Sequence, residues 1–410
     1  MDFFGKIFRG DRVIWMIFIF LCLISIVEVY SASSRLTYGV NYWEPIVQHS
    51  LGLIAGMFIV LLVHAIPPKY FSIIGVALPL VWGLLIYGWF SGSRSVFGIQ
   101  PAEFAKLCLI VLSAFIISKR KEGSDDPGFW WILTLTIITC GLIIKGNGST
   151  ALMLSGVMYL ILFISQTPWK KMLGLTASFV AVGMIFIAFL LITPTDVLNG
   201  QFINKYLPRA DTWKARIERH SDDSNDLYSP YFTIHTDDEQ IYLAQIAISN
   251  GGLFGKGLGN SVERDFLPDS VSDFIYAIII EETGLLFGGL FLLVLYLTLF
   301  IRAGIIAYRT DKIFLKMIVL GSAIMIVTQA LVHMAVCVRL IPVTGQTLPL
   351  ISLGRSSIIV VCTYFGMILS VSRYENPKGV QREEDIDAEM IAAAQTTENE
   401  INPENEPENE

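Results

Sequence analysis

The sequence predicts an all-α membrane protein that crosses a bilayer about ten times, with both termini in the cytoplasm and one long loop on the outer side. Three observations support this prediction. Hydrophobic residues make up 53% of the 410-residue chain and charged residues only 16%, whereas soluble domains carry about 25% charged residues. The apolar residues fall in runs long enough to span a bilayer, and the basic residues cluster in alternate connections between those runs.

The apolar runs define the predicted spans, since a helix needs about 20 mostly apolar residues to cross a bilayer. The runs are residues 13–32, 48–66, 70–90, 102–118, 129–144, 149–166, 172–193, 273–301, 314–336 and 347–373. The first run follows Lys6, Arg9 and Arg12, as the apolar core of a signal peptide would, and residues 31–33 resemble a cleavage site. Because further spans follow it, we interpret this run as a retained first helix.

The basic clusters predict the topology. They are Lys6, Arg9, Arg12, Lys69, Lys119, Arg120, Lys121, Lys170, Lys171, Arg302, Arg309, Lys312, Arg373, Lys378 and Arg382. By the positive-inside rule these segments and both termini are cytoplasmic, and the loop of about residues 194–272 lies outside. A loop of that length has room for an amphipathic or re-entrant element. We expect a transmembrane domain over residues 1–373 and a disordered acidic tail over 374–410, rich in Glu, Asn and Pro.

Other function classes are disfavoured. The chain has no basic stripe and no zinc-type Cys/His spacing, so we expect no nucleic-acid partner. The net charge of −7 says little about partners, because the acidic tail supplies much of it. All 5 cysteines fall within apolar runs, without a paired extracellular spacing, so we expect no disulfide.

Ionisable residues within the spans are candidates for function, because charges are costly at membrane depth. Glu103 and Lys106 are three residues apart, which places them on one helix face within ion-pair reach. They are either a structural pair or the wall of a cavity for an anionic substrate. Glu281 and Glu282 lie about 12 Å along the eighth predicted span, counted from Asp273 at 1.5 Å per residue. Two carboxylates there would suit a proton relay in a transporter.

Two further features lie in or beside the outer loop. Asp273 opens the eighth span, where it is either a helix cap or a carboxylate at the mouth of an outer cavity. Residues 251–259 read GGLFGKGLG, which matches neither a P-loop nor a dinucleotide-binding motif. We interpret this stretch as a tight, extended segment that could approach a bulky substrate closely.

Four blocks in order resemble the SEDS family, which includes FtsW, RodA and SpoVE. Residues 99–106 read IQPAEFAK, and residues 251–261 read GGLFGKGLGNS. Residues 267–276 read LPDSVSDFIY and are followed by EETG at 281–284, and residues 342–357 read PVTGQTLPLISLGRSS. The similarity covers about residues 12–373. The sequence departs from the family pattern at GNGST (146–150), which lacks the usual acid, and at Ser95, His333 and Arg355.

The resemblance implies a peptidoglycan glycosyltransferase that polymerises lipid II into glycan strands outside the inner membrane of a bacterium. It implies that Asp273 is the catalytic base. Within the family, the stretch TLPLIS (347–352) resembles the division-type FtsW more than RodA, in which a proline commonly takes the position of Thr347. This resemblance implies septal wall synthesis. Implied partners are a class B penicillin-binding protein and other divisome proteins.

The resemblance also suggests residues that bind the substrate. They are Glu103, Lys106, Arg216, Lys256, Glu281, Glu282, Ser352 and Ser356. Of these, Lys106, Arg216 and Lys256 are candidates to hold the pyrophosphate. We assign no metal ligand, although Mg²⁺ or Mn²⁺ could neutralise the pyrophosphate. Two other functions stay open: a lipid II flippase, which the buried charges would suit, and a non-catalytic scaffold of the division machinery.

Overall fold

The computed structural model describes residues 9–33, 44–93, 95–96, 98–120, 127–194, 197, 214, 236–267 and 270–374. The regular secondary structure of this part of the chain is helical, with one isolated bridge between Val96 and Ile99. Within it, 9 helical segments are long and apolar enough to cross a membrane, and α8 (Gly148–Ile164) is a shorter apolar helix. The prediction of about ten spans is therefore confirmed for the described residues.

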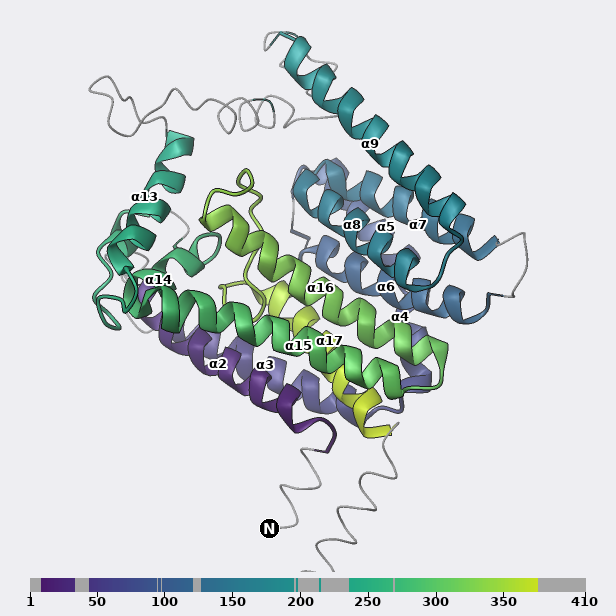
Figure 1. Cartoon of the computed structure of the whole chain (residues 1–410), viewed down its shortest axis with the longest axis horizontal. Coiled ribbons are helices and arrows are strands. Elements are labelled where there is room, and N and C mark those ends of the chain that lie inside the picture. The colour runs from purple at the N-terminus through teal and green to yellow at the C-terminus, as the bar shows by residue number, and fades with distance from the viewer. Residues whose placement is uncertain are drawn as a thin grey trace, which may run out of the picture.

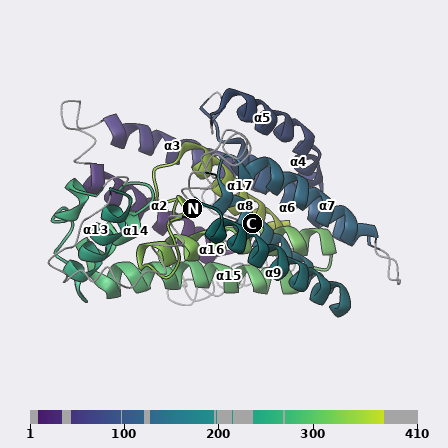
Figure 2. The same ribbon diagram turned by 90° about the horizontal axis from the view of Figure 1, so that it is seen from above.

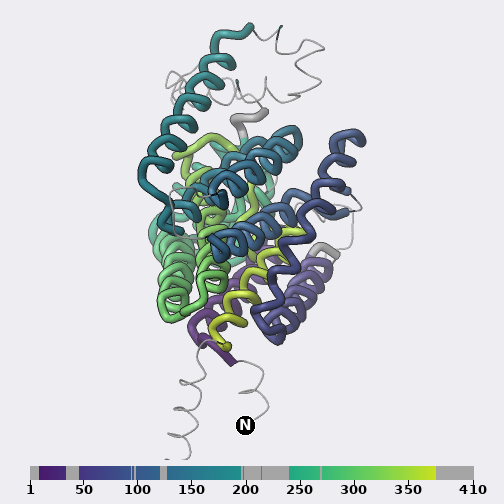
Figure 3. The backbone as a smooth tube through the Cα atoms, turned by 90° about the vertical axis from the view of Figure 1, so that its right-hand side faces the viewer, coloured from purple at the N-terminus to yellow at the C-terminus, as the bar shows by residue number. Residues whose placement is uncertain are grey.

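The helices form an elongated bundle, shown in three orientations in Figures 1, 2 and 3. The remaining helices of the spans are α2 (Arg12–Ala32), α3 (Glu44–Ala65), α4 (Ser72–Val76), α5 (Leu78–Ser91), α6 (Pro101–Ser118), α7 (Pro127–Ile144), α9 (Trp169–Ile192), α14 (Ile275–Gly284), α15 (Phe291–Arg309), α16 (Ile313–Cys337) and α17 (Arg355–Tyr374). Helix α13 (Thr236–Gly251) lies in the long loop between α9 and α14. The loop thus contains a helix, as its length allowed.

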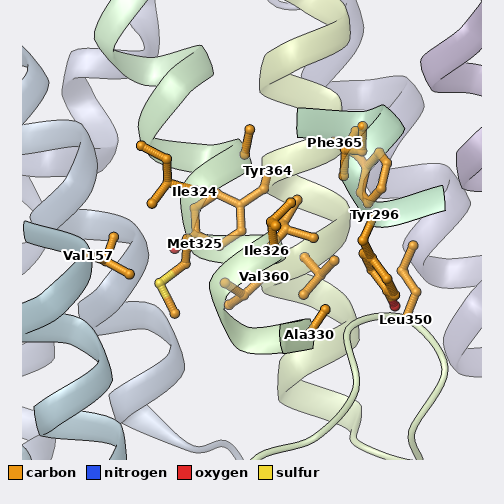
Figure 4. Close-up of a cluster of buried hydrophobic side chains, with 14 of the residues drawn as sticks. Val157, Tyr296, Ile324, Met325, Ile326, Ala330, Leu350, Val360, Tyr364 and Phe365 are labelled. Carbon is orange, nitrogen blue, oxygen red and sulfur yellow. The ribbon is translucent and has the colours of Figure 1, made fainter. Parts of the chain in front are cut away.

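Helices α16 and α17 form the centre of the bundle. In their most apolar stretches, 72% and 83% of the residues are buried, against 6% in α9. Helix α16 contacts α6, α8, α15 and α17, and α17 also contacts α3. Figure 4 shows the apolar side chains that fill the space between these helices, including Val157, Tyr296 and Tyr364. Helix α9 leans away from the others (Figure 1), so the buried polar groups belong to the inner helices.

The two ends of the bundle differ. At one end, a Cβ atom on Gly10 would lie 3.1 Å from the carbonyl oxygen of Leu369 in α17. At the same end Arg302 of α15 pairs with Asp11, and a ring nitrogen of His64 lies 2.8 Å from the carbonyl oxygen of Arg9. We call this the terminal end, and the opposite one the loop end. The first and last described helices thus meet at one end, as the charge alternation predicts, and the cytoplasmic location of that end stays a prediction.

The eighth predicted span is bent at its start. Helix α14 ends at Gly284, whose φ of 84° and ψ of 167° are not helical, and a π-helical segment (Leu285–Leu290) then leads into α15. Glu282 accepts a hydrogen bond from Ser31, the penultimate residue of α2. Glu282 therefore lies at the loop end, beside the end of the first span. It does not lie deep in a straight eighth helix, as counting residues along the sequence suggested.

Candidate active site

Asp273 lies in a turn at the loop end, just before α14. The helix begins at Ile275, and its N-cap position is occupied by Phe274, not by Asp273. The interpretation of Asp273 as the N-cap is therefore wrong. The Asp273 side chain lies against the loop between α16 and α17, because a Cβ atom on Gly345 would be 3.5 Å from its Oδ2 atom. Gly345 has a φ of 64° and no side chain, so it leaves room beside the carboxylate.

Ser352 joins the turn of Asp273 to the loop between α16 and α17. Its hydroxyl donates a hydrogen bond to the carbonyl oxygen of Ser272 at 2.6 Å and accepts one from the backbone N–H of Leu348 at 2.7 Å. The backbone N–H of Leu353 also donates to the carbonyl oxygen of Val271 at 2.9 Å. These bonds fix the backbone on the N-terminal side of Asp273. Ser352 therefore positions the candidate base.

A buried polar network supports this loop from the bundle side. The Lys106 ammonium lies 2.7 Å from the Glu103 carboxylate and donates to Gln329 Oε1 at 3.1 Å. Gln329 in turn donates to the carbonyl oxygen of Thr347 at 3.0 Å. Lys106 is only 1% exposed, so its charge is neutralised by Glu103 inside the protein. The predicted ion pair is present, and it is connected to the loop through Gln329.

Ser356 links the loop end of α17 to the start of α6. Its hydroxyl accepts a hydrogen bond from the backbone N–H of Gln100 at 3.0 Å. Beside it, the hydroxyl of Thr347 donates to that of Ser357 at 3.2 Å. The first and fourth sequence blocks thus meet in space.

His333 and Gln346 bring α8 into the same network. A His333 ring nitrogen lies 2.7 Å from the carbonyl oxygen of Gln346, whose side-chain amide donates to the Thr150 hydroxyl at 2.7 Å. His333 and Gln346 are 1% and 5% exposed. Neither Gln329 nor Gln346 was a candidate from the sequence, because neutral amides at membrane depth do not stand out as charges do.

The glycine-rich segment binds α14 through its backbone. The backbone N–H groups of Lys256 and Gly257 donate to the carbonyl oxygens of Glu281 and Glu282 at 2.9 and 2.8 Å. In the other direction, the N–H groups just after Gly284 donate to the carbonyl oxygens of residues 252 and 253, at 2.9 and 3.2 Å. We call residues 251–257 the clasp. It satisfies backbone groups on both sides of the helix break, which would otherwise lack partners.

The two glutamates of α14 hold the segment that follows the clasp. The Lys256 ammonium lies 2.8 Å from Glu281 Oε1, and the Ser261 hydroxyl also donates to Glu281. Glu282 accepts from Gly259 N at 3.1 Å, and Arg264 lies 3.6 Å from it. Both glutamates are at most 1% exposed. The predicted group of Lys256, Glu281 and Glu282 is therefore brought together.

Residues 261–265 pack around the same two carboxylates. Burial raises the pKa of Glu263 above its usual value, the nearby Glu281 carboxylate raises it further, and Lys256 opposes the shift. The backbone N–H of Glu263 donates to Glu281 at 3.3 Å. This part of the loop is thus tied to α14 by side chains as well as by the clasp.

Arg339 is a cation that the sequence did not single out, two residues after Cys337, which contacts the turn of Asp273. Its φ of 59° is left-handed, which is rare for a bulky residue and typical of functional sites. Its guanidinium lies 5.6 Å from the ring centre of Tyr242 in α13. Cys337, two residues earlier, has its sulfur 3.9 Å from the carbonyl oxygen of Asp273. Among the described residues no carboxylate pairs with Arg339.

The predicted site residues therefore form two groups. Glu103, Lys106, Ser352 and Ser356 belong to the network around the loop that faces Asp273. Lys256, Glu281 and Glu282 belong to the clasp. Arg216 and the tail after residue 374 lie outside the described residues.

Comparison with known proteins identifies the family. The model of the FtsW/RodA/SpoVE family, described as cell cycle protein, matches residues 11–377. A probable peptidoglycan glycosyltransferase FtsW of Bacillus subtilis is 29% identical over 377 residues, covering 87% of this chain and 89% of that protein. A probable peptidoglycan glycosyltransferase FtsW of Taylorella equigenitalis is 31% identical over 290 residues, covering 68% of this chain and 71% of that protein.

Solved structures show the same fold. One chain of a peptidoglycan synthase complex, studied for the coordination of polymerization and crosslinking, matches with a TM-score of 0.65 and 21% identity. The match covers 90% of this chain and 99% of that one. The rod shape determining protein RodA of Thermus thermophilus matches with a TM-score of 0.60 and 20% identity, over 90% of this chain and 98% of that one. This chain belongs to the FtsW/RodA/SpoVE family.

Proposed function

We propose that this multi-pass inner-membrane protein is a peptidoglycan glycosyltransferase, which polymerises lipid II into glycan strands at the outer face of the membrane for septal wall synthesis. One observation supports this function above the others. Ser352 holds the turn of Asp273 at the loop end, and the carboxylate of Asp273 lies beside Gly345, which has no side chain. Relatives from several bacteria are named probable peptidoglycan glycosyltransferases.

The proposed reaction needs a base. The donor is a glycan strand linked to polyprenyl pyrophosphate, and the acceptor is the 4-hydroxyl of the next lipid II. The hydroxyl oxygen attacks the anomeric carbon, the bond from that carbon to the pyrophosphate oxygen breaks, and Asp273 takes the hydroxyl proton. A positioned carboxylate that accepts this proton contributes typically 10²- to 10⁴-fold in rate. One displacement inverts the α-linked donor to a β-linked product.

The leaving pyrophosphate needs a cation. We propose Arg339 for this role. Arg339 follows two residues after Cys337, whose sulfur lies 3.9 Å from the carbonyl oxygen of Asp273, and two residues span at most about 7 Å of backbone. Of the cations expected from the sequence, Lys106 and Lys256 are each bound by a glutamate, at 2.7 and 2.8 Å. Lys256 remains a second candidate, because its side chain is 32% exposed.

The other predicted residues then act by positioning. The Glu103–Lys106 pair and Ser356 hold the loop that faces Asp273, and the two glutamates of α14 hold the far end of the helix that Asp273 precedes. Among the described residues no three His, Cys, Asp or Glu side chains form a metal-binding group. A divalent cation at the pyrophosphate stays an expectation from the sequence.

The proposed partners follow from the same comparison. One structural relative belongs to a complex that polymerises and crosslinks peptidoglycan. We propose that this chain assembles with a class B penicillin-binding protein, which would crosslink the new strands, and with other divisome proteins. Co-purification from native membranes should recover this transpeptidase, and repeated recovery of the chain without it would count against the assembly.

Purified protein in detergent provides the test of the reaction, because flipping has no meaning there. Wild-type protein with lipid II should yield glycan polymer. Asp273→Asn keeps the shape of the side chain and removes the ionisable group, so polymer formation should fall roughly 10²- to 10⁴-fold while lipid II still binds. Asp269→Asn, in the same stretch of loop, is the control. Normal polymerisation by folded Asp273→Asn protein would refute the role of Asp273. Absence of polymer from wild type, both alone and with the transpeptidase added, would favour the flippase.

A further inference from the structure

The segment that follows α13 exposes large apolar side chains. They are Leu253 (57% exposed), Phe254 (70%), Leu258 (58%), Val262 (52%) and Phe266 (61%). We call these five residues the apolar face. A soluble loop rarely exposes so many large apolar side chains within so short a stretch, and such patches mark surfaces that contact another molecule.

The apolar face is continuous with the outside of a membrane span. The rings of Phe254 and Phe287 lie 6.3 Å apart, centre to centre. Phe287 belongs to the apolar stretch Ile275–Arg309, and it is 62% exposed, while its neighbour Leu290 is 50% exposed. Surfaces of this kind on a span face lipid. The apolar face therefore extends the exposed apolar surface of this span toward the loop end.

Several polar groups of the same segment bind α14 and the residues just after it. The clasp exchanges backbone hydrogen bonds with residues 281–286, and the Lys256 ammonium is bound by Glu281 at 2.8 Å. Arg264 lies 3.6 Å from Glu282. Irregular backbone is tolerated close to lipid only where its polar groups have partners in the protein. The clasp, Lys256 and Arg264 meet that condition although the segment is not a regular helix.

We propose that residues 253–266 lie in the interfacial layer of the bilayer, with the apolar face in contact with lipid. The partner of this surface is thus the membrane. The clasp would then hold α14, and with it the turn of Asp273, at the level of the lipid headgroups. That last consequence rests on the proposed function, since a lipid-linked pyrophosphate lies at this level, but contact with lipid does not depend on activity.

Spin labels can measure the depth of this segment. Leu258→Cys and Phe266→Cys variants of the full chain would be labelled and reconstituted in phosphatidylethanolamine/phosphatidylglycerol vesicles, which leaves the Phe254–Phe287 contact intact. Ile301→Cys, at a site 61% exposed on a span, is the lipid control. Asp311→Cys, in the exposed connection between α15 and α16, is the water control. Collision of each label with oxygen and with a water-soluble nickel chelate reports its surroundings.

The two labels in the apolar face should collide with oxygen several-fold more often than with the nickel chelate, as the label at Ile301 should. An accessibility like that of Asp311 would overturn the proposal. The proposal would also be overturned if the nickel chelate reached the labels in the free protein and no longer reached them after a transpeptidase was added. The apolar face would then be a protein interface. The native cysteines are replaced by alanine; if that protein does not fold, only the half-buried Cys22 and Cys140 are replaced, since the other three are buried.

Discussion

Two glycines of the loop offer a matched test of the clasp. Gly255 and Gly259 both have a φ of 79°. An alanine at either position therefore pays the same cost for a left-handed backbone, about 1–2 kcal/mol. At Gly259 a Cβ atom meets nothing within 4 Å, whereas at Gly255 it would lie 2.3 Å from the carbonyl oxygen of Glu282. Gly255→Ala must therefore push the clasp away from α14.

The extra cost at Gly255 can be worked from the bonds that would break. The N–H groups of Lys256 and Gly257 would lose their carbonyl partners at 2.9 and 2.8 Å. Each bond contributes about 0.5–1.5 kcal/mol, and a buried carbonyl left without a partner costs about 1–3 kcal/mol. We expect Gly255→Ala to destabilise the protein by about 3 kcal/mol more than Gly259→Ala does. At about 2 °C per kcal/mol, the difference in Tm is about 6 °C.

Thermal unfolding of both variants in the same detergent measures this difference. Equal Tm values would refute the clasp as a stabilising contact. The sequence suggested another reason for these glycines, a close approach to a bulky substrate. In that case Gly255→Ala would keep the Tm of Gly259→Ala and raise KM for lipid II instead.

The remaining predictions concern the cation, the topology and the tail. Arg339→Gly removes the strain of a left-handed backbone, so Tm should stay unchanged or rise by a few degrees. Polymerisation should fall roughly 10²-fold, because the leaving pyrophosphate loses its cation. Full activity of this variant would show that Arg339 does not hold the pyrophosphate. A reporter fused after Asp222 should be extracytoplasmic and one after Lys121 cytoplasmic, and the same location for both would show a miscounted helix. Truncation after Lys378 should leave folding and polymerisation intact, whereas an unfolded product would show that the tail packs on the protein.

The sequence predicted the spans well because hydropathy is a property of local composition. The boundaries of α6, Pro101–Ser118, lie within a residue of the predicted run of 102–118. The Glu103–Lys106 pair could also be predicted from the sequence, because residues three apart on one helix lie on the same face within ion-pair reach. Its connection to Thr347 through Gln329 joins α6, α16 and the loop between α16 and α17, which are far apart in the sequence, so no local sequence pattern predicts it.

The helix break at Gly284 shows where such reasoning fails. A glycine within an apolar run is compatible with a helix, so counting residues placed Glu281 and Glu282 deep in a straight span. Arg339 was missed for a similar reason, because its left-handed backbone has no signature in the residue type. Both features depend on contacts with distant segments, the clasp in one case and α13 in the other.

The glycine-rich block and the EETG block are better understood as one unit. A Cβ atom on Gly251 would lie 2.1 Å from the carbonyl oxygen of Ile280, and one on Gly284 would lie 2.4 Å from that of Leu253. With Gly255, three glycines on two segments therefore exclude side chains from the same contact. A first substitution opens the clasp, so a second one there has less left to break, and the two costs are not additive. A single backbone contact thus requires glycines about 30 residues apart in the sequence. A search for sequence motifs would describe the two blocks as separate features.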